Sequence, residues 1–263
     1  MNIHKLDKVA KSLIKEAAGR IRASFTTELI IESKSEANDL VTNIDKETEQ
    51  YFIKNIKQNF PDHRIMGEEG FGDDIQDLSG YVWILDPIDG TMNFIHQKKN
   101  FAISLGIFKD GEGILGYIYD VMGDDLLSAA LGEGAFFNDQ RIPRVEHAKV
   151  EQSIISINAS WVVPNKYIEH EGMIQLLNKV RGTRSYGSAA IEILYVVMGR
   201  LDAYVSMRLS PWDIAGGIVI ANEVGANVTT LANEPINLMG QNTFIVSKPG
   251  LHEEILGNYV KLK

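Results

Sequence analysis

Apolar residues in the first part of the chain recur every three or four positions, with charged residues between them. This spacing covers residues 3–23 and predicts an amphipathic helix. A second stripe of the same kind starts at about residue 43 and stops before Pro61, so a second helix is expected there. Asn43 or Asp45 is expected to cap its first turn, because both residue types favour that position.

From residue 81 the pattern changes to short runs rich in β-branched and aromatic residues. Glycines and acidic turns separate these runs, which predicts an antiparallel sheet with strands at 81–85, 101–108, 114–121 and 125–131. The segment 111–116 fits the GxGxxG string of dinucleotide-binding turns, but strand-like residues follow it instead of a helix. We therefore expect a hairpin turn there.

After about residue 150, apolar runs alternate with helical stretches, which is the pattern of an α/β arrangement. The helical stretches are expected at 165–180, 188–199 and 213–224. No Pro/Ser-rich linker and no internal repeat divides the chain. We expect one compact unit, in which residues 1–145 form an α+β half and residues 146–263 form an α/β half.

Composition narrows the chemistry that the chain can carry. It has no cysteine, so a metal ion must be held by oxygen or imidazole ligands, which favours hard cations. The formal net charge of -9 repels the phosphates of nucleic acids. No apolar run is long enough to cross a bilayer, and the first residues lack the apolar stretch of a signal peptide. We expect a cytoplasmic protein with neither nucleic acid nor a membrane as its partner.

The motif WILDPIDGTMNF, at residues 83–94, carries the strongest chemical signal. A buried strand here ends in Asp86, and Asp89 follows in a turn for which Pro87 and Gly90 set the backbone. The two carboxylates and the Ile88 carbonyl can converge on one point, and these are the oxygen ligands that Mg²⁺ prefers. A helix that begins near Thr91 would turn its first N–H groups toward the same phosphate. An Asx-type turn after a strand is the plainer interpretation of the same residues.

Two further acidic positions are weaker signals when each is taken alone. Glu68 and Glu69 are typical of a solvated turn before the sheet, as well as of a ligand. Asp213 stands at the start of an apolar helix, where an N-cap role is the simpler interpretation. The two roles can coexist at one residue.

Taken together, these residues resemble the inositol monophosphatase family of Mg²⁺-dependent, lithium-sensitive sugar phosphatases. The resemblance extends over essentially the whole chain and is most specific in DPIDGT and WDIAGG. The matching motifs are Lys34 with Asp39–Thr42 and Asp45, then residues 67–69, 86–94, 186–190, 199–204 and 212–217.

The resemblance implies a layered αβαβα sandwich, a homodimer, and hydrolysis of a small phosphate ester with two or three Mg²⁺ ions. The implied metal ligands are Glu68, Asp86, the Ile88 carbonyl, Asp89 and Asp213, and a third, weaker ion is implied near the loop with Lys34 and Asp39. Thr91 and Glu68 would activate a water, with Asp45 supporting the Thr91 hydroxyl. The implied substrate contacts are Asp89, Gly90, Thr91, Gly187, Ser188, Ala189, Ser206, Arg208 and Asp213. His96, which follows the motif, is expected to be structural.

One position departs from the family pattern. Inositol-specific members carry a glutamate seven residues before the aspartate of the WD motif, and here that position is Ser206. Arg208 can favour a second phosphate, although a solvated loop position explains it equally well. NADP(H), fructose 1,6-bisphosphate, adenosine bisphosphate and histidinol phosphate therefore stay open beside inositol monophosphate. A metal-dependent phosphate sensor without turnover is the alternative from another functional class.

Overall fold

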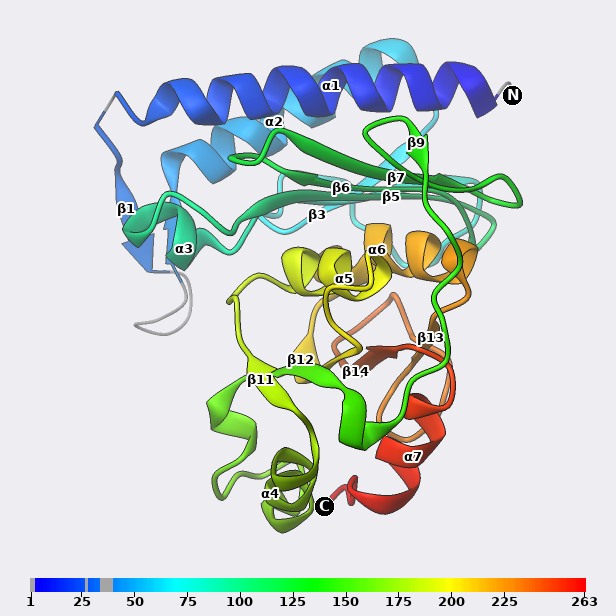
Figure 1. Cartoon of the computed structure of the whole chain (residues 1–263). Helices are drawn as coiled ribbons and strands as arrows, with labels where there is room; N and C mark the ends of the chain where they lie inside the picture. The colour runs from blue at the N-terminus through cyan, green and yellow to red at the C-terminus, as the bar shows by residue number, and fades with distance from the viewer. Residues whose placement is uncertain (1–2, 27, 34–39) are drawn as a thin grey trace.

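Five layers of alternating helices and sheets make up the structure (Figure 1). It is a computed structural model that describes residues 3–26, 28–33 and 40–263. The αβαβα sandwich implied by the sequence is therefore confirmed. Among the described residues, no helix is both long and apolar enough to cross a membrane.

The first layer consists of α1 (Ile3–Ser24) and α2 (Asn43–Asn59), both of which were predicted. Their buried faces pack on the large sheet. The expected cap of α2 is wrong: Thr42 is the N-cap, and Asp45 occupies the third helical position, where its carboxylate accepts the Thr42 N–H group. A short antiparallel pair of strands, β1 (Ile31–Ser33) and β2 (Leu40–Thr42), lies between the two helices in the chain.

The large sheet has seven strands in the order β3-β4-β5-β6-β7-β8-β9. The predicted antiparallel pairing is confirmed from β4 onward, whereas β3 was not predicted and pairs with β4 in parallel. The turn between β5 and β6 is a two-residue hairpin with positive φ at Asp110 and Gly111, so the GxGxxG string begins in a hairpin turn, as expected, and continues into β6. The strands are β3 (Arg64–Gly67), β4 (Tyr81–Asp89), β5 (Ala102–Lys109), β6 (Glu112–Asp120), β7 (Asp125–Ala130), β8 (Gly134–Phe137) and β9 (Gln140–Arg141).

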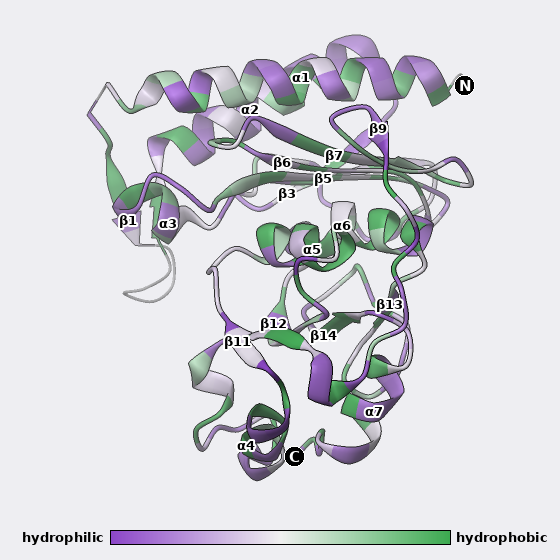
Figure 2. Cartoon of the chain, in the orientation of Figure 1, coloured by the Kyte–Doolittle hydropathy of each residue, from purple (hydrophilic) through white to green (hydrophobic). Residues whose placement is uncertain are grey.

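Three helices follow the predicted positions closely. The short α3 (Thr91–His96) begins at Thr91, directly after β4. The middle layer consists of α5 (Ala189–Val197) and α6 (Pro211–Val224), which pack between the two sheets and are hydrophobic over much of their surface (Figure 2). Helices between two sheets must bury most of their circumference, which explains why no polar stripe interrupts their sequences.

The second sheet has the order β11-β10-β12-β14-β13 and mixes parallel with antiparallel pairs. Its outer face is covered by α4 (His170–Lys179) and α7 (Leu251–Asn258). The remaining elements are η1 (Val150–Gln152), β10 (Ile154–Ile157), η2 (Ala159–Trp161), β11 (Gly182–Arg184), β12 (Ala203–Leu209), β13 (Asn227–Thr229) and β14 (Asn242–Ser247).

The helix expected at 165–180 begins five residues later than predicted, at His170. The Asn165 side chain accepts the N–H groups of Tyr167 and Ile168, and Ile168 bridges to Leu262 near the end of the chain. These contacts hold the segment in a non-helical form, so the local turn at Asn165 and the tertiary bridge override the helical pattern.

Gly216 tests how closely the middle layer packs on the large sheet. A Cβ atom at this position would lie 2.5 Å from the Tyr117 carbonyl oxygen and 2.8 Å from that of Leu105. We expect Gly216→Ala to lower the free energy of unfolding by roughly 1–3 kcal/mol in urea denaturation. Gly19→Ala, at an exposed helical position with open space around it, is the control and should raise that free energy by about 0.4–1 kcal/mol. Equal effects of the two substitutions would contradict the close packing.

Candidate active site

The last strand residues of β4 are irregular, and this irregularity brings two aspartates to the same side. Asp86 pairs with Ser104 and Asp89 pairs with Ala102, so three steps in β4 match two steps in β5. In a regular strand, residues three apart point to opposite faces. The bulge at Pro87 and Ile88 cancels that alternation. The Asp86 carboxylate also accepts the Ile88 N–H group at 2.9 Å, so the Asx-type turn considered above is present as well.

A third aspartate reaches the same place from the middle layer. Ser104, beside Asp86 in the ladder, donates its hydroxyl to the Trp212 carbonyl at 3.0 Å, which fixes the first turn of α6 against the sheet. Asp213 is the third residue of this helix, and its carboxylate accepts the Ser210 N–H group at 2.7 Å. The expectation that Asp213 itself is the N-cap is therefore wrong, because Ser210 holds that position.

Asp86, Asp89 and Asp213 form the cluster with the clearest metal-binding geometry. Each offers a carboxylate oxygen, and these oxygens all lie within 4.8 Å of one another. Asp86 and Asp89 are buried, and Asp213 is half-buried. Such a group of hard oxygen donors fits Mg²⁺.

Burial and mutual repulsion shift the titration of these acids. Burial, followed by the charges of Glu68, Asp89 and Asp213, raises the pKa of Asp86 well above its ordinary value. Burial also raises the pKa of Asp89 to about 6, although hydrogen bonds from Ser188 and from backbone N–H groups oppose the shift. Without a cation, the ionised cluster is therefore an unfavourable arrangement.

Glu68 approaches the cluster from the end of β3. It follows Gly67 directly, and its N–H group donates to the Leu85 carbonyl across the parallel ladder. Its charge contributes to the raised pKa of both Asp86 and Asp89, so the side chain faces them. Glu68 and Glu69 do form a turn, as in the plainer interpretation, but the turn follows a strand of the sheet and both residues are half-buried.

Thr91 and Asp45 are in contact, as the family resemblance implied. The Thr91 hydroxyl donates to one Asp45 carboxylate oxygen at 3.0 Å, and the Thr42 hydroxyl and N–H group bind the other. Asp45 is fully buried, and burial raises its pKa despite the hydrogen bonds from Thr42 and Thr91 that lower it. The hydroxyl of Thr91 therefore has a fixed direction.

The turn before α5 closes the site from the second half of the chain. The Ser188 hydroxyl and the Ala190 N–H group both donate to the same Asp89 oxygen, at 2.5 and 2.6 Å. Ser188 therefore holds the Asp89 carboxylate in place. The sequence had suggested only a substrate contact for this residue. Gly90, with φ of 96°, packs so closely that a Cβ atom would lie 3.0 Å from the Ser188 Cβ atom.

The remaining site residues expected from the sequence differ in their exposure to solvent. Ser206 is buried in β12, and Arg208, two residues further along the same strand, is exposed. Gly187 and Ala189 flank Ser188 in the turn before α5. His96 is exposed at the last residue of α3, so an interior structural role for it finds no support. Lys34 and Asp39 lie outside the described residues.

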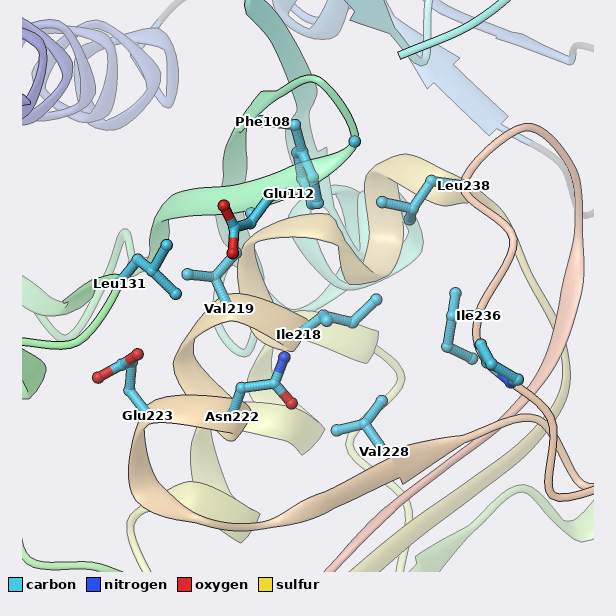
Figure 3. A pocket seen from close by; sticks show the side chains of 13 residues that line it. Phe108, Glu112, Leu131, Ile218, Val219, Asn222, Glu223, Val228, Ile236 and Leu238 are labelled. Carbon is cyan, nitrogen blue, oxygen red and sulfur yellow. The ribbon is translucent and has the colours of Figure 1, made fainter. Parts of the chain in front are cut away.

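A separate hollow of about 350 Å³ lies along the second half of α6 (Figure 3). Phe108, Ile218, Val228 and Leu238 contribute apolar walls, and Glu112 and Asn222 add polar groups. None of the carboxylates described above lines this hollow. It is distinct from the candidate active site.

Sequence reasoning missed three residues that support the site. Glu49 and Glu192 are buried glutamates on α2 and α5, and Asn93 on α3 donates its amide to the carbonyls of Tyr186 and Asn100. A signal for the first two exists in the sequence. Glu49 lies on the apolar stripe of its helix, three residues before Phe52, and Glu192 interrupts the apolar run 189–197.

Comparison with known proteins agrees with this geometry. The family model described as "Inositol monophosphatase family" matches residues 2–262. The chain is 50% identical over 259 residues to an inositol-1-monophosphatase of Bacillus subtilis, covering 98% of each chain. It is 38% identical to a fructose-1,6-bisphosphatase/inositol-1-monophosphatase of Thermotoga maritima, covering 86% of this chain and 84% of the other.

The chain belongs to the inositol monophosphatase family. Its activity class is accordingly that of a phosphatase, and the family is metal-dependent.

Solved structures of family members superpose closely on this chain. SaIMPase-II with bound inositol monophosphate has 41% identity and a TM-score of 0.88, covering 97% of this chain and 93% of the other. An IMPase/NADP phosphatase complexed with NADP and Ca²⁺ has 30% identity and a TM-score of 0.91, covering 99% of each chain. A staphylococcal inositol monophosphatase-1 soaked in LiCl, described as an inhibitory complex, has 30% identity and a TM-score of 0.91, covering 97% of this chain and 94% of the other.

The crowded carboxylates lead to a prediction about metal and stability. The raised pKa of Asp89 means that the folded protein favours the protonated carboxyl group. Protonated Asp89 therefore contributes fully to the free energy of unfolding below about pH 4, and this contribution is lost as the pH rises through about 6. Mg²⁺ at about 100 times its Kd should add about 2.7 kcal/mol of stability. At one fixed Mg²⁺ concentration, the gain should be larger at about pH 7.5 than at about pH 5, since protons compete for the carboxylates and raise the Kd.

Thermal unfolding with and without MgCl₂, at both pH values, measures this effect. Asp89→Asn should unfold at a higher temperature than the wild type without metal, because it removes one of the repelling charges. It should also lose most of the stabilisation by Mg²⁺. An unchanged Mg²⁺ shift in this variant would show that Asp89 is not a ligand.

Proposed function

We propose that this protein hydrolyses a small phosphomonoester in a Mg²⁺-dependent reaction, with inositol monophosphate as the first candidate substrate. The observation that carries the proposal is the cluster of Asp86, Asp89 and Asp213, whose oxygens lie within 4.8 Å of one another. Membership in the inositol monophosphatase family and the 50% identity to an inositol-1-monophosphatase support it.

The proposed ligands are divided between two Mg²⁺ positions. Glu68, Asp86 and the Ile88 carbonyl would hold the first ion, and Asp86, Asp89 and Asp213 would hold the second. Bound Mg²⁺ supplies a water of lowered pKa and offsets the negative charge of the phosphate. This agrees with the acidic character of the site, which by itself repels a phosphate.

The protein's own residues orient the attacking water. The Thr91 hydroxyl donates its hydrogen bond to Asp45. Its oxygen can therefore accept a hydrogen bond from a water, but it has no second hydrogen to donate. A water that donates to Thr91 and Glu68 turns its oxygen lone pair toward the phosphorus atom. This arrangement uses positioning and proton acceptance without a covalent phosphoenzyme.

Thr91→Ala tests this role. We expect kcat to fall by about 100-fold or more, because the water loses an acceptor that directs it. Mg²⁺ affinity should change little, since the threonine is not a proposed ligand. Steady-state phosphate release combined with Mg²⁺ titration separates the two quantities. A variant with normal kcat would remove Thr91 from the mechanism.

The substrate is expected to bind between α3, α5 and β12. Ser206 and Arg208 lie two residues apart near the end of β12, where the pairing with β14 becomes irregular between Ser206 and Leu209. Ser206 stands where inositol-specific members have a glutamate, and the exposed Arg208 adds a positive charge. Its relatives include proteins named as phosphatases of inositol monophosphate, fructose 1,6-bisphosphate and NADP. A substrate with a second phosphate, such as NADP or a bisphosphate, is therefore the second candidate.

A panel of phosphate esters decides between these candidates. We expect inositol 1-phosphate to give the highest kcat/KM, with Li⁺ inhibiting the reaction. Arg208→Ser should raise KM for NADP and for fructose 1,6-bisphosphate while leaving inositol 1-phosphate unaffected, because only the former carry a second anionic group near it. Arg181→Ser, at another exposed arginine, is the control. Absence of phosphate release from every ester would instead support a metal-dependent phosphate sensor.

The assembly and location remain part of the proposal. Light scattering on the purified protein tests the homodimer implied by the family resemblance. Cell fractionation tests the cytoplasmic location.

A further inference from the structure

Two glutamates outside the proposed metal ligands are buried directly behind the site. Glu49 on α2 is 0% exposed and Glu192 on α5 is 3% exposed. Placing a carboxylate in the interior is unfavourable unless donors satisfy it. Among the described residues, no lysine or arginine forms an ion pair with Glu192, whose pKa is raised by burial. The contacts of these two carboxylates therefore need an explanation.

Glu192 holds the turn before its own helix. Its oxygen Oε1 accepts the Tyr186 N–H group at 2.6 Å. The turn held in this way carries Ser188, whose hydroxyl binds Asp89. A chain of two contacts thus connects Glu192 with a proposed metal ligand.

Glu49 also holds a turn, the one that carries Glu68 on the other side of the site. Its two oxygens accept the N–H groups of Glu69 and Phe71, at 2.7 and 2.8 Å. Gly67 packs directly on the carboxyl group, since a Cβ atom there would lie 2.4–2.6 Å from it. The turn 67–71, which presents Glu68, is therefore built around the Glu49 carboxylate.

We propose that Glu49 and Glu192 are positioning residues for the metal site, each acting through the turn that it holds. Glu192 acts through Ser188 on Asp89, and Glu49 acts through the turn 67–71 on Glu68. The inference rests on the proposed metal-dependent function. It differs from a purely structural role, in which both residues would contribute to folding without affecting how the ligands bind a metal ion.

The hydrogen bonds of the two carboxylates differ in one respect that makes the proposal specific. At Glu49 both oxygens accept N–H groups, so a glutamine would direct its NH₂ group at a donor. At Glu192 the oxygen Oε2 is buried without a hydrogen-bond partner, so a glutamine can keep the acceptor for Tyr186 and place its NH₂ group there. Glutamine should therefore replace Glu192 well and Glu49 poorly.

Calorimetric titration of the substrate-free protein with Mg²⁺ tests this inference. We expect Glu192→Ala to weaken Mg²⁺ binding by about 10-fold or more, as for other residues that orient metal ligands, and Glu192→Gln to restore most of the affinity. Glu49→Gln should weaken it by about 10-fold. Glu171→Ala, at an exposed glutamate on α4, is the control and should bind Mg²⁺ as the wild type does.

A double-mutant cycle tests the connection through Ser188. If Glu192 acts through Ser188, then Ser188→Ala and Glu192→Ala remove the same link. The double variant should then bind Mg²⁺ with about the same affinity as the single variant that has the lower affinity. Additive losses would overturn the proposed route. Ser188→Ala also decides the matter if Glu192→Ala does not fold, because normal Mg²⁺ affinity in Ser188→Ala would overturn it as well.

The outcomes separate this inference from the proposed function. Lower melting temperatures with wild-type Mg²⁺ affinity would show that the two glutamates stabilise only the fold. A wild-type protein that binds Mg²⁺ but releases no phosphate would remove the proposed function, and the titrations would still decide the positioning roles. A wild-type protein that binds no Mg²⁺ would overturn both.

Discussion

The main constraint on this structure is that several carboxylates lie close together at the end of β4, where they repel one another. Asp86, Asp89 and Asp213 come from two layers of the fold, and Glu68 adds its charge from the end of β3. In the absence of a cation, burial and repulsion both oppose ionisation. The surrounding fold must therefore supply enough stability to hold the cluster in place. A bound divalent cation converts this repulsion into attraction.

Backbone donors fix the direction of each carboxylate. Asp86 accepts an N–H group two residues further along, whereas Asp45 and Asp213 accept the N–H group of the residue that caps their helix. Asp89 accepts one from Ala190 in the first turn of α5. The first turns of α2 and α6 also carry partial positive charge, which favours acids there. The same hydrogen bonds that begin the helices thus orient the carboxylates, and the contact of Asp213 with the N-cap residue Ser210 is compatible with a ligand role for Asp213.

Local patterns in the sequence predict much of this arrangement, and long-range contacts determine the rest. The amphipathic stripes of α1 and α2 and the apolar strands are local, so both were predicted correctly. The bulge that turns Asp86 and Asp89 to one side depends on the pairing of β4 with β5, which no local pattern contains. The late start of α4 depends in the same way on contacts near the end of the chain. Glu192 was missed because a single acid in an apolar run gives no periodic signal.

The proposed metal ligands and the positions Ser206 and Arg208, which we propose to influence substrate choice, lie in different parts of the molecule. The acids that would bind metal lie at the ends of β3 and β4 and in the first turn of α6, whereas Ser206 and Arg208 lie on β12 of the second sheet. A change on β12 can alter which leaving group fits without disturbing the β4 bulge or the turns that hold Glu68 and Asp89. This separation offers a physical reason why proteins of one fold carry names that refer to inositol monophosphate, fructose 1,6-bisphosphate and NADP. Replacing the exposed Arg208 would leave the repelling carboxylates in place, whereas any change at the buried Ser206 must also fit the interior of the second sheet.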